Sequence, residues 1–248
     1  MPIVGEGAFG YGPWHMAKPP RTELKLVGPD LETRFYLRRA LERTGAVLVL
    51  GAADGRLPLE LAAMGRTVVG VEPSPMLREL AKERLLSAGE RLDARVRLIA
   101  DDPRSLQLEE RFGLVFAPHN ALGLAGSPEE LEAMLRVARA HLEPGGLVAF
   151  DVLHPPEPDP DENGNAPHAP IPPVRPGFAP HLRARRVEGT RRSREILRLK
   201  SRPLRVMEVD RALDAAGLIA TERFADFQGG PFSYAAERQV VVSETVRD

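Results

Sequence analysis

The residues best suited to chemistry begin with a glycine-rich turn, Gly51-Ala52-Ala53-Asp54-Gly55, directly after a continuous apolar run. Such a turn between a strand and a helix lets backbone N–H groups approach a ligand at the positive end of the helix. It is not the dinucleotide fingerprint, which would need glycine at Ala53 and Arg56, and it lacks the Gly-Lys-Ser/Thr of a P-loop. Taken alone, the pattern also fits an ordinary tight turn.

Acidic residues follow two later strands of the expected sheet. Glu72 ends the second apolar strand, and its carboxylate could accept hydrogen bonds from both hydroxyls of a ribose, as in nucleotide-binding α/β folds. Asp101 and Asp102 follow the third strand, where a carboxylate could accept a hydrogen bond from the exocyclic amine of a purine. The alternatives are a solvated acid at Glu72 and a helix cap or surface turn at the aspartates.

His119 and Asn120 follow the fourth strand and are the candidate catalytic residues. His119 could act as a general base, because the ordinary pKa of histidine lies near 6.5. Asn120 could orient an amine or a carbonyl. The alternatives are a loop histidine bonded to backbone and a simple turn residue. The other histidines near the acids of the proline-rich segment match no metal motif, so we expect no metal site.

Strands and helices alternate along the first 152 residues, which predicts how these residues are positioned. Buried apolar runs predict parallel strands, and periodic segments predict helices, the first from Asp30 and ended by Gly45. A turn at Gly145-Gly146 should precede the fifth strand. The expected strands are 46–50, 67–71, 96–100, 113–117 and 147–152, and the expected helices after the first are 57–64, 75–88 and 128–141. Five alternating strands imply a doubly wound α/β sheet with its ligand crevice along the edge of the strand C-termini.

The pattern changes after Asp151. Ten prolines between 155 and 180 exclude a central strand or helix interior, and residues 183–205 carry ten Arg and Lys against two Glu. We expect a linker followed by a basic β-ribbon that turns at Gly189-Thr190, and then a helix near 208–216 and strands at 218–224 and 238–243, the last antiparallel. The expected units are an N-terminal arm or lid (1–29), a Rossmann-like core (30–154), the linker and ribbon (155–206), and a C-terminal part that completes the sheet (207–248).

Composition excludes several classes of function. The 248-residue chain has a formal net charge of −1, which argues against a dedicated nucleic-acid binder. It has no cysteine, so disulfides, thiolate metal sites and cysteine nucleophiles are excluded. Without an apolar stretch long enough for a membrane span or a secretory signal, the sequence predicts a soluble cytoplasmic protein. A homo-oligomer is possible but cannot be predicted.

Residues 31–152 resemble the class I S-adenosylmethionine-dependent methyltransferases, in particular the small-molecule branch with glycine and aminosugar N-methyltransferases. The resemblance rests on 47–56, on Gly70-Val71-Glu72-Pro73-Ser74-Pro75-Met76-Leu77, and on the turn Leu142-Glu143-Pro144-Gly145-Gly146. The segments 226–232 and 237–241 are similar to the closing strands of that branch.

The resemblance implies S-adenosylmethionine as cofactor and a small-molecule methyl acceptor. It implies that the 51–55 turn wraps the methionine part, that Glu72 binds the ribose, that Asp102 lies beside the adenine, and that Ala117 to Asn120 flank the sulfonium and the acceptor. The residues it assigns to cofactor binding are Gly51, Ala52, Ala53, Asp54, Gly55, Glu72, Pro73, Asp101, Asp102 and Ala117.

Two departures from the family pattern lie in the cofactor turn. Val49 stands where the family usually has an acid that organises the loop and the cofactor's amino group, and Ala53 stands where it usually has glycine. A Cβ in a left-handed conformation costs about 1 kcal/mol. We expect methyl transfer to N or O of a small molecule, and the alternative is a non-catalytic protein that keeps the fold for binding or assembly.

Overall fold

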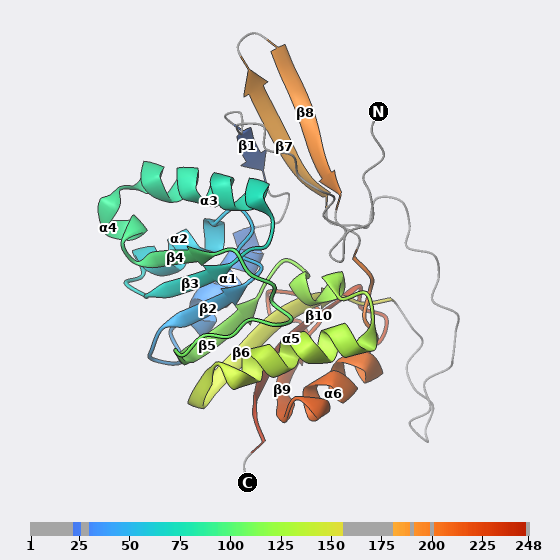
Figure 1. Ribbon diagram of the computed structural model, residues 1–248. Helices are drawn as coiled ribbons and strands as arrows, with labels where there is room; N and C mark the ends of the chain where they lie inside the picture. Colours follow the sequence, from blue (N-terminus) through green and yellow to red (C-terminus); the bar gives the residue numbers. More distant parts are fainter. Residues whose placement is uncertain (1–21, 26–29, 156–180, 189–190, 199–200, 247–248) are drawn as a thin grey trace.

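The computed structural model describes residues 22–25, 30–155, 181–188, 191–198 and 201–246, with backbone alone in the first, third and fourth ranges and at Asp30. Its centre is a seven-stranded sheet in the order β4-β3-β2-β5-β6-β10-β9 (Figure 1). The strands are β2 (Val47–Leu50), β3 (Val68–Val71), β4 (Val96–Ile99), β5 (Phe112–Ala117), β6 (Leu142–Leu153), β9 (Leu218–Phe224) and β10 (Arg238–Thr245).

Strands β2 to β6 are parallel, whereas β10 is antiparallel to both of its neighbours, β6 and β9. This confirms the predicted mostly parallel sheet with an antiparallel C-terminal strand. The inner strands β2, β3 and β5 contain no polar side chain, as expected where helices cover both faces of a sheet. In β2, Val47 and Val49 pack on one face, and Leu48 and Leu50 pack on the other.

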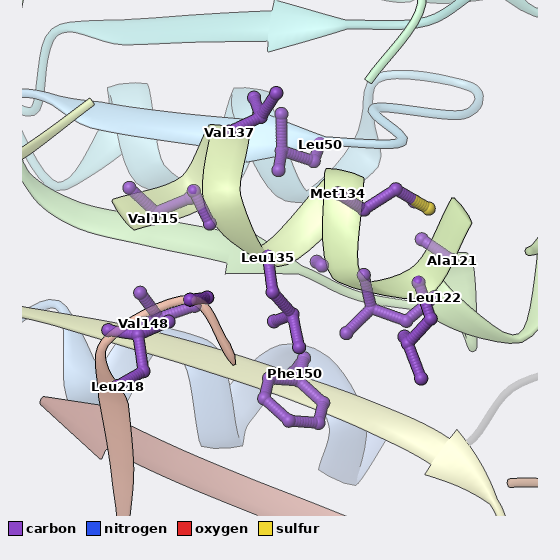
Figure 2. Close-up of a cluster of buried hydrophobic side chains, with 14 of the residues drawn as sticks. Leu50, Val115, Ala121, Leu122, Met134, Leu135, Val137, Val148, Phe150 and Leu218 are labelled. Carbon is purple, nitrogen blue, oxygen red and sulfur yellow. The ribbon is translucent and has the colours of Figure 1, made fainter. Parts of the chain in front are cut away.

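The helices form two layers around the sheet (Figure 1). Helices α1 (Asp30–Arg39) and α2 (Arg56–Ala63) pack on the face of Val47 and Val49, and α5 (Pro128–Ala140) and α6 (Val206–Ala215) pack on the other. Figure 2 shows Leu135 of α5 pointing toward Phe150 of β6, and Met134 of α5 beside Ala121 of η1. The remaining helices are α3 (Pro75–Ala88), the short α4 (Glu90–Asp93) and the 3-10 turn η1 (Ala121–Leu124).

Helices α3 and α5 begin where their sequences predict. In each, a serine precedes a proline that occupies the first turn: the Ser74 hydroxyl accepts a hydrogen bond from the Leu77 amide, and the Ser127 hydroxyl accepts one from the Glu130 amide. Serine caps a free N–H group, and proline at the first position loses no helical hydrogen bond. The start of α3 is important for the site because Pro75, its first residue, lies three residues after Glu72.

A second sheet of three strands, in the order β1-β7-β8, lies apart from the first (Figure 1). Strands β7 (His181–Glu188) and β8 (Arg191–Arg198) are antiparallel, as predicted for the basic ribbon, and the predicted turn at 189–190 lies outside the described residues. Strand β1 (Thr22–Lys25) pairs with β7. The N-terminal arm is therefore not irregular throughout, because four of its residues extend the ribbon into a sheet.

Two boundaries differ from the predictions. Helix α1 ends at Arg39 rather than near Gly45, and Leu41, which continues the helical spacing, is 72% exposed. Gly145 and Gly146 do not precede the fifth strand but lie within β6, where the pairing with β5 shifts between Phe112 and Leu114. Phe112 pairs with Leu142 and Leu114 with Leu147, so β6 has three more residues than β5 over this stretch, and the glycines lie in a bulge of a longer strand. The proline-rich segment from 156 to 180 lies outside the described residues.

Candidate functional site

The parallel strands bring most of the predicted site residues to one edge of the sheet. The glycine-rich loop directly follows β2 and Glu72 directly follows β3, whereas Asp101 lies two residues after β4 and His119 two residues after β5. The carboxyl ends of parallel strands share an edge, and β3, β2 and β5 are direct neighbours. The loop, Glu72 and His119 therefore form one group, with the aspartates one strand further out.

The loop adopts a conformation that its two glycines permit. Gly51 has φ +85° and Gly55 has φ +77°, in the left-handed region that favours glycine. A Cβ on Gly51 would lie 3.0 Å from the Cβ of Ala121 in η1, and one on Gly55 would lie 2.8 Å from the Cβ of Ala81 in α3. The loop is therefore pressed between η1 and α3, and neither position has room for a side chain.

Glu72 is buried and is bonded directly to this loop. Its Oε2 accepts a hydrogen bond from the Ala53 amide at 2.9 Å, and its Oε1 accepts one from the Ser74 amide at 2.9 Å. Burial raises the pKa of Glu72 to about 7, although the bonds from Ser74 and Ala53 and the charges of Arg78 and His119 oppose the rise. Each carboxylate oxygen keeps a second lone pair for another donor.

The Pro73 carbonyl, like that of Glu72, accepts a hydrogen bond at 2.7 Å from Nη1 of Arg78 in α3. This guanidinium fixes the turn that leads from β3 into α3. The position of the Glu72 carboxylate therefore depends on the backbone around it as well as on its own two hydrogen bonds.

The side chain of Asp54 contacts α3. Its carboxylate is 1% exposed and forms an ion pair with Arg84, whose Nε also donates to the Asp54 carbonyl at 3.0 Å. The ion pair fastens the loop to α3. Any contact of Asp54 with a ligand would therefore come from its backbone more readily than from its carboxylate.

Asp101 and Asp102 are joined to their own turn. Asp101 Oδ1 accepts a hydrogen bond from the Asp102 amide at 2.7 Å, as the alternative of a surface turn predicts. The Asp102 carboxylate pairs with Arg104 at 2.8 Å, and Arg104 also pairs with Glu130 of α5 at 2.7 Å. The Asp102 side chain remains 28% exposed, so it keeps access to a neighbouring ligand.

His119 and Asn120 follow the buried Ala117 and have positive φ angles of +60° and +57°, which non-glycine residues adopt rarely. Glu32 accepts a hydrogen bond from the His119 amide at 2.9 Å, and its Oε1 also lies 2.7 Å from Nδ1 of the His119 ring. Asp151 Oδ2 accepts from the Asn120 amide at 3.1 Å. Two acids thus fix this unusual turn.

Sequence analysis did not assign site roles to the residues that surround His119 and Asn120. Asp151 is fully buried in β6, accepts a hydrogen bond from the Tyr36 hydroxyl at 2.9 Å and pairs with Arg238 of β10. Burial, together with the charge of Glu32, raises the pKa of Asp151 to about 6 against the effects of Arg238, His119 and Tyr36. An aspartate inside an apolar strand was the available signal at β6, whereas Glu32 in the first turn of a helix looked like an ordinary helical acid.

The Asn120 side chain is buried. Its Oδ1 accepts a hydrogen bond from the Leu153 amide at 3.0 Å, and no donor contact of Nδ2 occurs among the described residues. A Cβ on Gly123 would lie 2.3 Å from Asn120 Oδ1, so the amide fills the space that this glycine leaves. The Asn120 side-chain amide therefore links the end of β6 to the start of η1.

The two departures in the loop have different consequences. Ala53 has φ +49°, so the chain keeps the left-handed conformation in spite of its Cβ. Val49 is fully buried in the cluster that contains Tyr36 and Phe116. A carboxylate at position 49 would need a polar partner among these rings.

No helix in the described ranges is long and apolar enough to cross a bilayer. Within the same ranges, no group of three or more histidine and acidic side chains is arranged to hold a metal ion.

The comparisons with known proteins agree with this fold. Residues 47–146 match the family described as "Methyltransferase domain". The cypemycin N-terminal methyltransferase of a Streptomyces species is 37% identical over 112 residues, which are 45% of this chain and 43% of that protein. The chain thus matches less than half the length of this curated relative.

Solved structures match over a longer part of the chain. The CcbJ methyltransferase of Streptomyces caelestis has a TM-score of 0.67 and 24% identity, over 90% of this chain and 93% of that one. The glycopeptide N-methyltransferase MtfA, in complex with S-adenosylmethionine, has a TM-score of 0.60 and 18% identity, over 93% of this chain and 100% of that one. The chain therefore has the fold of the class I S-adenosylmethionine-dependent methyltransferases, and its residues 47–146 match a methyltransferase domain.

Proposed function

We propose that this protein transfers a methyl group from S-adenosylmethionine to a nitrogen or oxygen atom of a small molecule. The observation that carries the proposal is the bond between Glu72 and the glycine-rich loop. It places a buried carboxylate and a strained backbone turn next to each other at the ligand edge of the sheet. The domain match over 47–146 supports the same conclusion.

The residues at this edge fit the cofactor. The glycine-rich loop turns at this edge, packed against η1 at Gly51, so its backbone can form a wall beside the methionine part. The free lone pairs of Glu72 suit two ribose hydroxyls, and the partly exposed Asp102 suits an adenine amine. In this proposal Ala52, Pro73, Asp101 and Ala117 contribute to the walls of the cofactor site, and Asp54 anchors the loop.

When bound, S-adenosylmethionine supplies an electrophilic methyl group, and its sulfur keeps the electron pair of the broken C–S bond. The chain must therefore orient the acceptor and exclude water, which supplies much of the acceleration in reactions of this kind. His119 is the candidate base for an acceptor that must lose a proton, and Asn120 fixes the end of β6 beside it.

Calorimetric titration with S-adenosylmethionine and S-adenosylhomocysteine tests the proposal. We expect both to bind and to raise the melting temperature by mass action. The Glu72→Ala variant should bind them about 1–3 kcal/mol more weakly, because polar ligand groups lose their partner. Glu79→Gln is the matched control, since Glu79 lies in α3 and, among the described residues, forms an ion pair with Lys82 alone, at the surface.

The alternative, a non-catalytic protein with the same fold, predicts a different result. Neither ligand would then release heat or shift the melting curve at millimolar concentration. We further propose that the acceptor is a small molecule rather than a nucleic acid and that the protein acts in the cytoplasm, which rests on the balanced charge and the absence of cysteine in the sequence.

A further inference from the structure

The His119 ring pairs with Glu32, an acid that is distant from it in the sequence. Glu32 in the first turn of α1 lies 87 residues earlier, and its Oε1 is 2.7 Å from His119 Nδ1. The Glu32 side chain is 9% exposed, whereas that of His119 is 24% exposed. No hydrogen bond or ion pair of the other ring nitrogen, Nε2, occurs among the described residues. The pair therefore has a buried acid at one end and an imidazole that reaches solvent at the other.

The backbone beneath the ring is strained and fixed from several sides. Two successive non-glycine residues in the left-handed region cost about 1–2 kcal/mol each and persist only when their surroundings hold them. Glu32 accepts from the amide of His119, Asp151 accepts from that of Asn120, and the Asn120 side chain accepts from Leu153. Strain of this kind is concentrated at functional sites, where it fixes the direction of a side chain.

The charged groups around His119 come from every side of the site. Glu32 lies on α1, Asp151 on β6 and Asp54 in the loop after β2, and the charge of Glu72 also interacts with the ring. Arg238 of β10 offsets part of this negative charge, because it pairs with Asp151 and interacts with Glu32. Burial lowers the pKa of His119, but the charge and hydrogen bond of Glu32, with Asp151 and Asp54, hold it above its usual value.

We propose that Glu32 is a positioning residue that holds the Nδ1–H of His119 and so presents Nε2 as the base to the methyl acceptor. The inference rests on the proposed function and adds the residue that positions the base. The proton of the acceptor's N–H or O–H group passes to Nε2, and the bonding pair stays on the acceptor as the lone pair that attacks the methyl group. The positive charge on the imidazole is then stabilised by Glu32, which remains ionised.

NMR of the full chain with isotope-labelled histidine tests this without an acceptor. His119→Gln assigns the resonances of the ring. We expect neutral His119 to carry its proton on Nδ1 and to titrate above 6.5. In Glu32→Gln its pKa should fall by about 1 unit or more, because an opposite charge at this distance shifts a pKa by about 1–3 units. Glu32→Asp should restore part of the shift, and Glu42→Gln, an exposed acid paired with Arg39, should cause none.

A second measurement relates the ring to the cofactor site. S-adenosylhomocysteine should shift the His119 resonances and slow the carbethoxylation of this histidine by diethyl pyrocarbonate, located by mass spectrometry. Neutral His119 with its proton on Nε2, an unchanged pKa in Glu32→Gln, or bound S-adenosylhomocysteine without effect on His119 would each overturn the inference. If S-adenosylhomocysteine fails to bind at all, the proposed function fails and the inference falls with it, which calorimetry distinguishes from the other outcomes.

Discussion

Replacing Glu72 with glutamine separates what this acid does for folding from what it does for the ligand. Its pKa rises from 4.5 to about 7 because it is buried, with 3% of its surface exposed. At about 1.4 kcal/mol per pH unit, this corresponds to about 3 kcal/mol. A group whose pKa is raised by folding stabilises the folded state at low pH. That contribution is complete below 4.5 and is lost as the pH rises through 7.

The free energy of unfolding of Glu72→Gln should therefore increase relative to that of the wild type as the pH rises. Glutamine cannot accept from both Ala53 and Ser74, so Glu72→Gln carries a cost of about 1–3 kcal/mol that is independent of pH. The variant also lacks the free-energy cost of ionising a buried carboxyl group, which the wild type carries at high pH. The difference in free energy of unfolding between variant and wild type should thus shift by about 3 kcal/mol in favour of the variant between pH 4.5 and pH 8.

Urea unfolding across this pH range measures the difference directly, and subtraction of the two curves removes the titration of His119 and Asp151. Glu79→Gln is the control and should show no such shift. The affinity for S-adenosylhomocysteine should fall in the wild type below pH 7, where Glu72 gains a proton, and should be low and flat in the variant. A constant stability difference from pH 4.5 to 8 would refute the reasoning.

Two further changes test the loop itself. Ala53→Gly should raise the free energy of unfolding by about 1 kcal/mol, because it removes a Cβ at φ +49°. The neighbouring change Ala52→Gly should lower the free energy of unfolding. Thermal melts that rank the two variants in the opposite order would contradict the assignment of strain. Arg84→Ala should destabilise the fold by about 3–5 kcal/mol by leaving the buried Asp54 carboxylate unpaired, and urea curves that match the wild type would show that this ion pair does not support the loop.

The sequence contains enough information to predict the central sheet. The continuous apolar runs at β2 and β5 predict strands covered on both sides, and the helices expected from 75 and 128 begin there as α3 and α5. The errors occur where local spacing and tertiary packing disagree. Leu41 continues the spacing of α1, yet the helix has no apolar surface to cover there and ends at Arg39. The four residues of β1 form a strand only because β7 provides a partner.

The same contrast between local pattern and tertiary packing applies to the candidate site. The loop at Gly51, the acid at Glu72 and the histidine at 119 are predicted because each lies within two residues of the end of a strand in a parallel sheet. Glu32 and Arg238 are not predicted, because they come from a helix and from the antiparallel strand β10. Their relation to His119 depends on how α1 and β10 pack against β6, and no pattern of spacing records that packing.

The departure at Ala53 adds conformational strain to the glycine-rich loop and leaves the shape of the loop intact. A glycine at this position would adopt a positive φ freely, and Ala53 adopts one as well, at φ +49°. Its amide donates to Glu72, a bond worth about 1.5–3 kcal/mol for a charged acceptor, which exceeds the strain of about 1 kcal/mol. The same carboxylate that the ligand would use therefore holds the loop in place, and for this reason binding and loop geometry should fail together when Glu72 is removed.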